Sequence, residues 1–317
     1  MDRERDYKMN VKIIGGSGFI GNHLSKRMAS QGHHVTVLDL KKPRILGANV
    51  YRPDSGEASW YNPIKFAGID ITNYRDVYWN IDRGDYVINV AAIAQFAQAE
   101  SDPHFTMSVN VTGAANVLKA CIDNKAAKLI YTSTGSVYST DVKVPIDEDQ
   151  PTEPTSTYGM SKLWAERIQM HYADKIPLTI LRLPHVVGPG KVSGANTFIV
   201  KLKANERPVI FGDGSNKNDF TCVDDVVQAI ELALTKEATG IFNIGSGESR
   251  STLDFLTWSR RLLDKMHIEP VFAPPRGVDF PVFEYNIDKA KKELGYRPKC
   301  NLEDTLRKTI VEFEQWL

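Results

Sequence analysis

The amino-acid sequence predicts an α/β fold, a doubly wound parallel sheet joined to a smaller, discontinuous C-terminal region. Three observations indicate this fold. A strand–helix–strand unit of about 30 residues starts near the N-terminus. Short apolar runs then alternate with helical patterns as far as Leu183, and the pattern changes after Pro184. Strands that alternate with helices form parallel sheets, which helices cover on both faces.

The elements of the sheet follow one another along the chain. The first apolar run ends in glycines, and Leu24 and Met28 then give the next segment a helical spacing. Gly32 ends that helix before the second apolar run. The expected strands are 11–14, 35–40, 86–92, 128–134 and 178–183, and the expected helices are 22–31, 103–124 and 157–174.

The C-terminal part has a different pattern. Glycine and proline are frequent over residues 188–194, and a strand with a turn follows at 209–215. Residues 41–64 hold three prolines and two glycines, which predicts a loop. Helical patterns recur at 224–234, 251–266, 288–294 and 302–316.

The composition excludes several classes of protein. The chain has 317 residues, with 39 Lys and Arg against 39 Asp and Glu, so its formal net charge is zero. Such a chain has no general attraction for nucleic acid or for an anionic membrane. A hydrophobic fraction of 42% is typical of a globular protein. No apolar run reaches the roughly 18 residues of a membrane span. The charged start, MDRERDYKMN, does not resemble a secretory signal.

The three cysteines, Cys121, Cys222 and Cys300, are far apart in the sequence. Their odd number and wide spacing predict neither a disulfide framework nor a CxxC metal site, and we expect no metal. Unpaired cysteines are typical of a reducing compartment, so we expect a cytoplasmic protein.

A glycine motif indicates a dinucleotide site. Gly15, Gly18 and Gly21 follow the first strand and open the first helix. The first glycine permits a tight turn, the second lets a pyrophosphate approach the backbone, and the third lets helix and strand pack closely. Asp39 ends the second strand, where a carboxylate would bind the ribose hydroxyls of an adenosine. Taken alone, the motif is explained equally well by a plain glycine-rich turn.

Asp39 also predicts which dinucleotide is bound. A carboxylate repels the 2′-phosphate of NADP, so we expect NAD as the cofactor. Lys41 and Lys42 are close enough in sequence to bind such a phosphate, although a solvated basic pair is the preferred interpretation.

With these features in place, the sequence resembles the extended short-chain dehydrogenase/reductases, within their group of NAD-dependent epimerases and dehydratases. The resemblance runs from near Asn10 to the C-terminus and rests on the order and spacing of short motifs. These motifs are GGSGFIG (15–21), the Asp70–Ile71 pair, NVAA (89–92), NVTG (110–113), YTSTGSVY (131–138), YGMSK (158–162), GDGS (212–215) and DFTCVDDVV (219–227).

The resemblance implies a Rossmann domain over residues 1–184, with returning segments near 219–245 and 272–290. It implies a mainly substrate-binding region over 185–317. Asp70 and Ile71 would flank the adenine, and Ala91 and Ala92 of the NVAA segment would lie along the cofactor. Taken alone, the NVAA segment is also typical of a buried strand end. The implied NAD-binding set is Gly15, Gly18, Phe19, Ile20, Gly21, Asp39, Asp70, Ile71, Ala91, Ala92, Asn110, Thr132, Tyr158, Lys162 and Pro184.

Tyr158 and Lys162 carry the expected chemistry. They are four residues apart at the start of a predicted helix, so their side chains share a face. The pKa of a free tyrosine is about 10, too high for a base at neutral pH. A nearby ammonium and the positive nicotinamide ring would lower that pKa, and Tyr158 would then take the proton of a substrate hydroxyl. The resemblance adds Thr134 as the hydrogen-bond partner of the reacting oxygen, with Ser133 and Thr132 as neighbouring candidates.

Gly135 and Ser136 follow Thr134. In the family that the sequence resembles, sugar 4,6-dehydratases have an Asp–Glu pair at these places, and decarboxylating relatives have an acid. UDP-glucose 4-epimerases have small residues there. Since neither Gly nor Ser transfers protons usefully, we expect an epimerase or a simple dehydrogenase.

The resemblance also suggests substrate-binding residues, with two departures. His185 stands where the family usually has Asn, and it is equally consistent with a structural histidine. Asn218 stands where an Arg usually neutralises a pyrophosphate. Asn196 and Arg276 are the further substrate-binding candidates, although Arg276 is also what a surface residue of a proline-rich loop looks like. Alternative cations are Lys201, Lys203, Arg207 and Lys217.

The leading expectation is therefore epimerisation of a nucleotide sugar, most simply at C4 of a UDP-hexose, through a transient keto-sugar and bound NAD. The alternative is an NAD-dependent dehydrogenase or reductase of another sugar derivative or a sterol-like alcohol. A non-catalytic NAD sensor would have no need of the Thr, Tyr and Lys described above. Family members commonly dimerise through two helices of each subunit. We therefore expect a homodimer formed by helices 103–124 and 157–174, without nucleic-acid or membrane partners.

Overall fold

The computed structural model describes residues 8–42, 64–191, 193–275 and 281–316. Its centre is a seven-stranded sheet in the order β11-β6-β5-β4-β1-β2-β3, and the neighbouring strands from β5 to β3 run parallel. This confirms the predicted doubly wound α/β fold. The strands are β1 (Asn10–Ile14), β2 (His34–Asp39), β3 (Lys65–Gly68), β4 (Tyr86–Asn89), β5 (Lys128–Thr134), β6 (Leu178–Leu183) and β11 (Gly240–Asn243).

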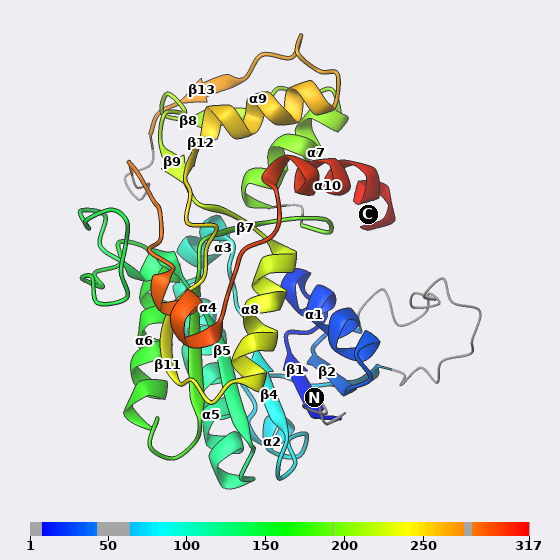
Figure 1. The fold of residues 1–317 in the computed structure, drawn as a ribbon, viewed down its shortest axis with the longest axis vertical. Helices are drawn as coiled ribbons and strands as arrows, with labels where there is room; N and C mark the ends of the chain where they lie inside the picture. The colour runs from blue at the N-terminus through cyan, green and yellow to red at the C-terminus, as the bar shows by residue number, and fades with distance from the viewer. Residues whose placement is uncertain (1–7, 43–63, 192, 276–280, 317) are drawn as a thin grey trace, which may run out of the picture. The chain divides into compact units, whose positions relative to one another are not determined.

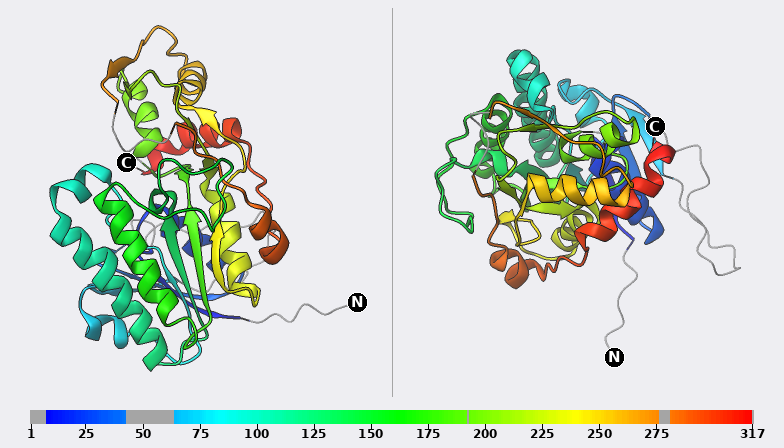
Figure 2. Two further views of the ribbon diagram at one scale, coloured as in Figure 1. Left: turned by 90° about the vertical axis from the view of Figure 1, so that its left-hand side faces the viewer. Right: turned by 90° about the horizontal axis from the view of Figure 1, so that it is seen from above.

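Helices connect these strands. Figure 1 shows α1 beside β1 and β2, and Figure 2 shows α5 running alongside the C-terminal part of α6. Among the described residues, no helix combines the length and the apolar character that a membrane crossing requires. The helices are α1 (Phe19–Ser30), α2 (Tyr74–Tyr78), α3 (Phe96–Ser101), α4 (Pro103–Met107), α5 (Ala114–Asp123), α6 (Thr157–His171) and α8 (Val223–Thr235).

The helix expected over 103–124 is interrupted. A π-helical segment, η2 (Ser108–Gly113), separates α4 from α5. Within it, the Asn110 side chain accepts a hydrogen bond from Ile93 N at 2.8 Å and donates one to Ile93 O at 3.1 Å. A wider turn of this kind is frequent at functional positions. Here it presents Asn110 to the loop that follows β4.

The chain divides into two compact units, each made of three stretches. The first holds Met1–Ile93, His104–Thr132 and Trp164–Thr179, and its core includes the buried residues of β1 and β2. The second holds Ala94–Pro103, Ser133–Leu163 and Ile180–Leu317, and one of its apolar clusters contains Phe198, Phe220 and Phe255.

The second unit also contains the smaller elements of the C-terminal half. They are η3 (Gly135–Val137), β7 (His185–Val187), η4 (Gly194–Asn196), α7 (Thr197–Lys203), β8 (Val209–Phe211), β9 (Lys217–Asn218), β10 (Phe220–Cys222), β12 (Arg250–Ser251), α9 (Thr252–Leu262), β13 (Val271–Ala273), η5 (Ala290–Leu294) and α10 (Leu302–Trp316). Figure 1 shows α7 and α10 next to α9 in this unit, in agreement with the shared apolar cluster.

Candidate active site

The glycine loop of the first unit leaves no room for side chains. Gly15 has φ +80°, and a Cβ there would lie 2.6 Å from Ala91 N. A Cβ on Gly21 would lie 2.5 Å from Gly15 O, so α1 begins directly against the loop. A side chain on Gly18 would also crowd Gly15 O, at 3.2 Å. Backbone packed this closely, at the N-terminus of a helix, fits the pyrophosphate of a dinucleotide.

Asp39 lies against the same loop. Its Oδ2 accepts a hydrogen bond from Ser17 N at 3.0 Å, and its Oδ1 accepts one from Lys41 N at 3.2 Å. The end of β2 is thereby tied to the turn between β1 and α1. The side chains of Lys41 and Lys42 are exposed. The structure thus brings Asp39 and the three glycines together, as the sequence predicts for an adenosine ribose beside a pyrophosphate.

The expected adenine-side residues are fixed by neighbouring elements. Ile71 is buried, and a Cβ on Gly113 would lie 2.9 Å from its Cγ2. The Ile71 carbonyl accepts a hydrogen bond from Asn116 Nδ2 at 3.0 Å. Asp70 Oδ1 accepts bonds from Thr72 N and Thr72 Oγ1 at 2.8 and 2.7 Å. Ile71 therefore packs against Gly113, the last residue of the NVTG segment.

Two more of the expected cofactor residues belong to the first unit. Ala91 N donates to Asn89 Oδ1 at 3.1 Å, and Thr132 Oγ1 donates to Asn89 O at 3.3 Å. Asn89 therefore orients the ends of both β4 and β5. The Thr132 hydroxyl is engaged in this structural bond, whereas the Thr134 hydroxyl accepts a hydrogen bond from Ser136 N at 3.2 Å.

The catalytic candidates come together in the second unit. The side chains of Thr134 and Tyr158 share a hydrogen bond. Thr134 ends β5, and Tyr158 is in the first turn of α6. Lys162 is 2% exposed, one helical turn further along α6. The Ser133 hydroxyl is buried and has no hydrogen-bond partner among the described residues. The geometry therefore favours Thr134 over its two neighbours as the partner of Tyr158.

Burial has a strong effect on Tyr158 in the protein alone. Desolvation raises the pKa of Tyr158 to about 12, and the hydrogen bond with Thr134 lowers it by less. The pKa rises because removing a phenolate from water costs more free energy than one hydroxyl donor returns. The lowering expected from the sequence includes the charge of the nicotinamide ring, so it stays a prediction for the complex with NAD. Tyr158 is therefore protonated at neutral pH until a further positive charge acts on it.

Gly135 lies directly under two aromatic rings. A Cβ at Gly135 would lie 2.2 Å from Phe283 Cζ and 2.8 Å from Tyr285 Oη. Phe283 and Tyr285 also stack edge-to-face, with ring centroids 4.9 Å apart. The sequence contains a glycine at this position but does not reveal which neighbouring residues require it. The structure gives the cause, because the segment after β13 occupies the space that an acidic side chain would need.

Glu100 is a residue that the sequence analysis missed. Its two carboxylate oxygens accept hydrogen bonds from Thr157 N at 2.7 Å and from Thr157 Oγ1 at 2.9 Å. Thr157 begins α6 and immediately precedes Tyr158, so a carboxylate on α3 caps the helix that carries this catalytic candidate. Glu100 and Thr157 are too far apart in sequence for any capping motif to reveal the pair.

Most of the predicted substrate-side residues have structural partners. Asn196 is buried, and its Nδ2 donates to Gly188 O and Lys191 O at 2.9 and 3.0 Å. Its Oδ1 is buried without a hydrogen-bond partner among the described residues. His185 is exposed and Asn218 is buried. Arg276 lies outside the described residues.

Three of the four alternative cations have partners elsewhere, and Lys217 is exposed. Lys201 pairs with Glu206, the ammonium of Lys203 lies over the Phe313 ring, and Arg207 donates to two backbone carbonyls at 3.0 Å. A further cation, Lys191, lies in the loop between β7 and η4. Its Nζ donates to Val186 O at 2.9 Å, and burial lowers the pKa of Lys191 to about 8. This lysine was not among the sequence candidates.

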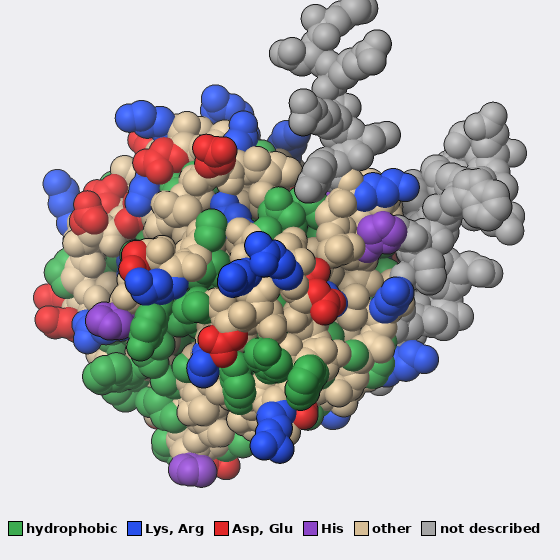
Figure 3. All heavy atoms as spheres, turned by 90° about the horizontal axis from the view of Figure 1, so that it is seen from below, with side chains coloured by type: hydrophobic (Ala, Val, Ile, Leu, Met, Phe, Trp, Pro, Cys, Tyr) green, Lys and Arg blue, Asp and Glu red, His purple; other side chains and the backbone are tan. Residues whose placement is uncertain are grey.

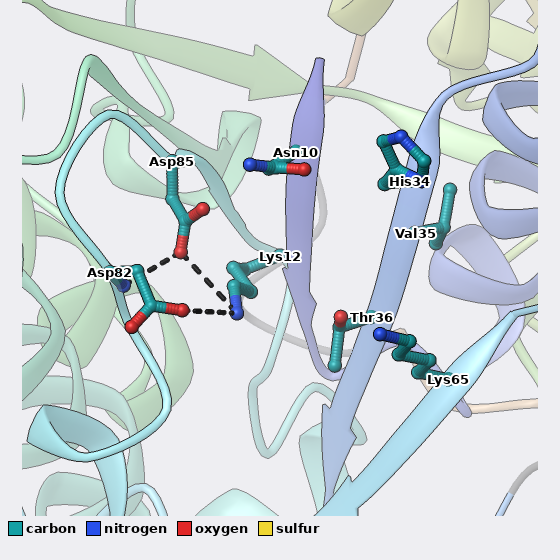
Figure 4. Close-up of a pocket in the computed structure, with 8 residues that line it drawn as sticks. All are labelled: Asn10, Lys12, His34, Val35, Thr36, Lys65, Asp82 and Asp85. Carbon is teal, nitrogen blue, oxygen red and sulfur yellow. Dashed lines mark hydrogen bonds and ion pairs between the residues drawn. The ribbon is translucent and has the colours of Figure 1, made fainter. Parts of the chain in front are cut away.

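A separate hollow in the first unit contains none of the predicted site residues. It has a volume of about 450 Å³ and lies over the N-terminal ends of β1, β2 and β3 (Figure 4). Lys12 occupies its centre, 3.2 Å from Asp82 and 3.4 Å from Asp85. The charges in this hollow neutralise one another. The face in Figure 3 likewise intersperses Lys and Arg with Asp and Glu. An anionic ligand must therefore be held by local donors.

Comparison with known proteins identifies the family. The model of the NAD dependent epimerase/dehydratase family matches residues 11–245. The UDP-glucose 4-epimerase of Mycolicibacterium smegmatis is 29% identical over 315 residues, covering 96% of this chain and 98% of that protein. The Thermotoga maritima UDP-glucose 4-epimerase, solved with UDP-glucose, is 30% identical with a TM-score of 0.87, covering 97% and 99%. The Thermus thermophilus enzyme, solved with NAD, is 27% identical with a TM-score of 0.81, covering 96% and 99%. The chain belongs to the NAD-dependent epimerase/dehydratase family.

Proposed function

We propose that this protein is an NAD-dependent epimerase that inverts C4 of a UDP-hexose. The family match and the full-length similarity to UDP-glucose 4-epimerases support an epimerase that acts on nucleotide sugars. The close-packed glycine loop and Asp39 supply a site that fits NAD. NAD bound there would supply the hydride acceptor for C4 of the sugar and the hydride for either face of the ketone.

The residues of the second unit move the proton. Tyr158 in its phenolate form takes the proton of the C4 hydroxyl as that carbon is oxidised, and it returns the proton when the ketone is reduced. Thr134, which already bonds Tyr158, donates a hydrogen bond to the same substrate oxygen. Lys162 holds the nicotinamide ribose and adds the positive charge that stabilises the phenolate. Asn196, whose Oδ1 has no hydrogen-bond partner in the part of the chain that the structure describes, is the candidate for accepting a hydrogen bond from the substrate.

The crowding at Gly135 is the observation that favours epimerisation over dehydration. In the related dehydratases the acid and base that eliminate water stand immediately after the hydroxyl residue. Here Phe283 and Tyr285 leave no space for a side chain at Gly135. Removing a hydroxyl from the sugar requires protonation of the leaving group, and no residue at this position supplies it. An epimerisation needs only the proton transfers of Tyr158.

The test is the conversion of UDP-glucose by purified protein supplied with NAD. We expect UDP-galactose to form to equilibrium while the absorbance of NADH shows no net increase. The alternative function is that of a dehydrogenase. Asn218 favours it, because the family usually has a pyrophosphate-binding arginine at this position. Stoichiometric accumulation of NADH without formation of UDP-galactose would contradict the epimerase and support the dehydrogenase.

We further propose that the protein is a cytoplasmic homodimer. In the first unit, Phe105 and Trp164 are 42% and 53% exposed, and Met170 and Tyr172 are also exposed. Trp164 borders a hollow of about 460 Å³ that is also lined by His104, Met107 and Val111. Exposed aromatic side chains around a hollow are typical of a protein–protein interface. The segments that carry them are the two helical regions from which the sequence predicted a dimer.

A further inference from the structure

Two of the three cysteines meet in the second unit, together with a carboxylate. Cys222 is the N-cap residue of α8, Asp225 is in the first turn of that helix, and Cys300 lies in the segment before α10. The two sulfurs and a carboxylate oxygen of Asp225 all lie within 4.8 Å of one another. No sequence motif indicates this cluster, since Cys300 is remote from the other two residues. The remaining cysteine, Cys121, is fully buried in the first unit.

The surrounding structure holds this cluster in place. Asp225 Oδ1 accepts a hydrogen bond from Lys299 N at 2.8 Å, and Oδ2 accepts one from Cys300 N at 3.2 Å. The carboxylate thereby fixes the backbone that presents the Cys300 thiol. Cys222 Sγ lies 2.7 Å from Thr305 Oγ1 in α10. Cys222 is 3% exposed and Cys300 is only partly buried, so an ion has a route to the cluster from one side.

We propose that Cys222, Asp225 and Cys300 bind one divalent cation of the zinc class. Two thiolates and a carboxylate are ligands typical of Zn²⁺ and of its softer analogue Cd²⁺. In a tetrahedral zinc site the sulfurs lie about 3.8 Å apart, given Zn–S bonds of about 2.3 Å. The largest separation in the cluster must therefore close by about 1 Å, a change that side-chain torsions provide. A water or the Thr305 hydroxyl completes the four ligands.

The bound ion would join two segments of the second unit that are distant in sequence. One is the start of α8 and the other is the stretch that leads into α10. Metal binding to the folded state alone stabilises the protein by RT ln(1 + [L]/Kd), where [L] is the free ion concentration, so stability rises with the logarithm of that concentration above Kd. The epimerase mechanism uses none of these three residues. Failure of the metal proposal would therefore leave the proposed function untouched, and the reverse also holds.

The experiment is a Cd²⁺ titration of the full-length, untagged protein in a non-thiol reductant. We expect thiolate-to-cadmium charge-transfer absorption that saturates at one ion per chain, and displacement of Cd²⁺ by Zn²⁺. The melting temperature should rise with Zn²⁺ concentration. Absence of the charge-transfer band at micromolar protein and metal would overturn the proposal.

Matched variants identify the ligands. Cys222→Ser and Cys300→Ser should each weaken Cd²⁺ binding at least tenfold and halve the charge-transfer band, and Asp225→Asn should weaken binding with the band retained. Cys121→Ser and Asp224→Asn are the controls, because Asp224 is exposed and its nearest cation, Lys308, is 3.9 Å away. Both controls should bind as the parent does. Circular dichroism and NAD affinity verify that each variant folds. Wild-type cadmium affinity in folded Cys300→Ser, or its loss in Cys121→Ser, contradicts the site.

Discussion

Asp39 joins two elements of the dinucleotide site through its hydrogen bond with the Ser17 amide. A carboxylate in this position accepts ribose hydroxyls and repels a 2′-phosphate. We predict that the wild type binds NAD at least tenfold more tightly than NADP, and that Asp39→Ala loses most of that preference by weakening NAD. Calorimetric titration with both cofactors measures this. Lys42→Ala is the control, since its exposed side chain should not alter NAD affinity. Equal affinity of the wild type for both cofactors would remove this role from Asp39.

In the proposed mechanism, turnover depends most on Tyr158. Tyr158→Phe should lower kcat by about 10²–10⁴-fold, the usual loss when a general acid–base group is removed, while NAD affinity persists. Thr134→Ala should cost less, because it removes a hydrogen bond and leaves the base. Steady-state kinetics and NAD titration of the same preparations check both. Near-normal turnover of Tyr158→Phe would exclude the mechanism.

The same tyrosine gives a prediction about pH. Burial raises the pKa of Tyr158 to about 12, above the value of about 10 in an unfolded chain. The folded state thus favours the protonated form. The stability that this contributes is fully present below about pH 10 and is lost as the pH rises towards 12. Saturating NAD brings positive charge near the phenol, so its pKa should fall. The measurement is a titration of tyrosinate absorbance, from which the titration curve of the Tyr158→Phe variant is subtracted. The pKa of Tyr158 should be lower with NAD than without it, and an equal pKa under both conditions would contradict the prediction.

At the scale of the element, α6 depends on a cap from outside the helix. Both oxygens of Glu100 bind Thr157, the residue before Tyr158. Glu100→Ala should lower the stability of the protein by about 0.5–2 kcal/mol, the usual cost of losing an N-terminal cap. It should also lower kcat more than it raises KM, because Tyr158 loses its fixed position. Thermal unfolding and kinetics measure the two effects.

Two further variants separate positioning by Glu100 from general damage. Glu100→Gln keeps one acceptor oxygen and should recover part of kcat. Gln98→Ala, an exposed change on the same helix α3, should leave both kcat and stability unchanged. If Glu100→Ala lowers stability while kcat stays at the wild-type value, the carboxylate supports the helix without positioning Tyr158.

The helices and strands also show which parts of the fold could be predicted from the sequence. Local patterns predicted β1, β2, β4, β5 and β6 and the helices α1, α5 and α6, but not β3 or α2, since apolar spacing and glycine punctuation act within a few residues. The break in helix 103–124 was missed because its cause is a tertiary bond from Asn110 to the loop after β4. The sequence analysis missed three further features for the same reason. They are the Glu100 cap, the two aromatic rings beside Gly135 and the cluster that contains Cys222 and Cys300. Each joins residues that only the fold brings together.

At the scale of the whole molecule, the exposed aromatic residues give a prediction about assembly. We expect a dimer in solution, and Trp164→Glu should convert it to a monomer by placing a charge in the interface. Trp79→Glu is the matched control, since Trp79, the C-cap residue of α2, is 77% exposed and lies outside the hollow beside Trp164. Light scattering at micromolar concentration distinguishes the two. A monomeric wild type would contradict the proposed dimer.

The position of β11 next to β6 has a consequence for attempts to express the cofactor domain by itself. A fragment that stops at residue 184 would keep β6 but lose β11, which pairs with it in the full chain. The freed edge has the sequence LTILRL, and all of its residues are buried in the intact protein. An unpaired, apolar strand edge recruits strands from other molecules. Such a truncation should therefore collect in inclusion bodies, whereas one that supplies residues 240–243 on a linker should stay in the supernatant.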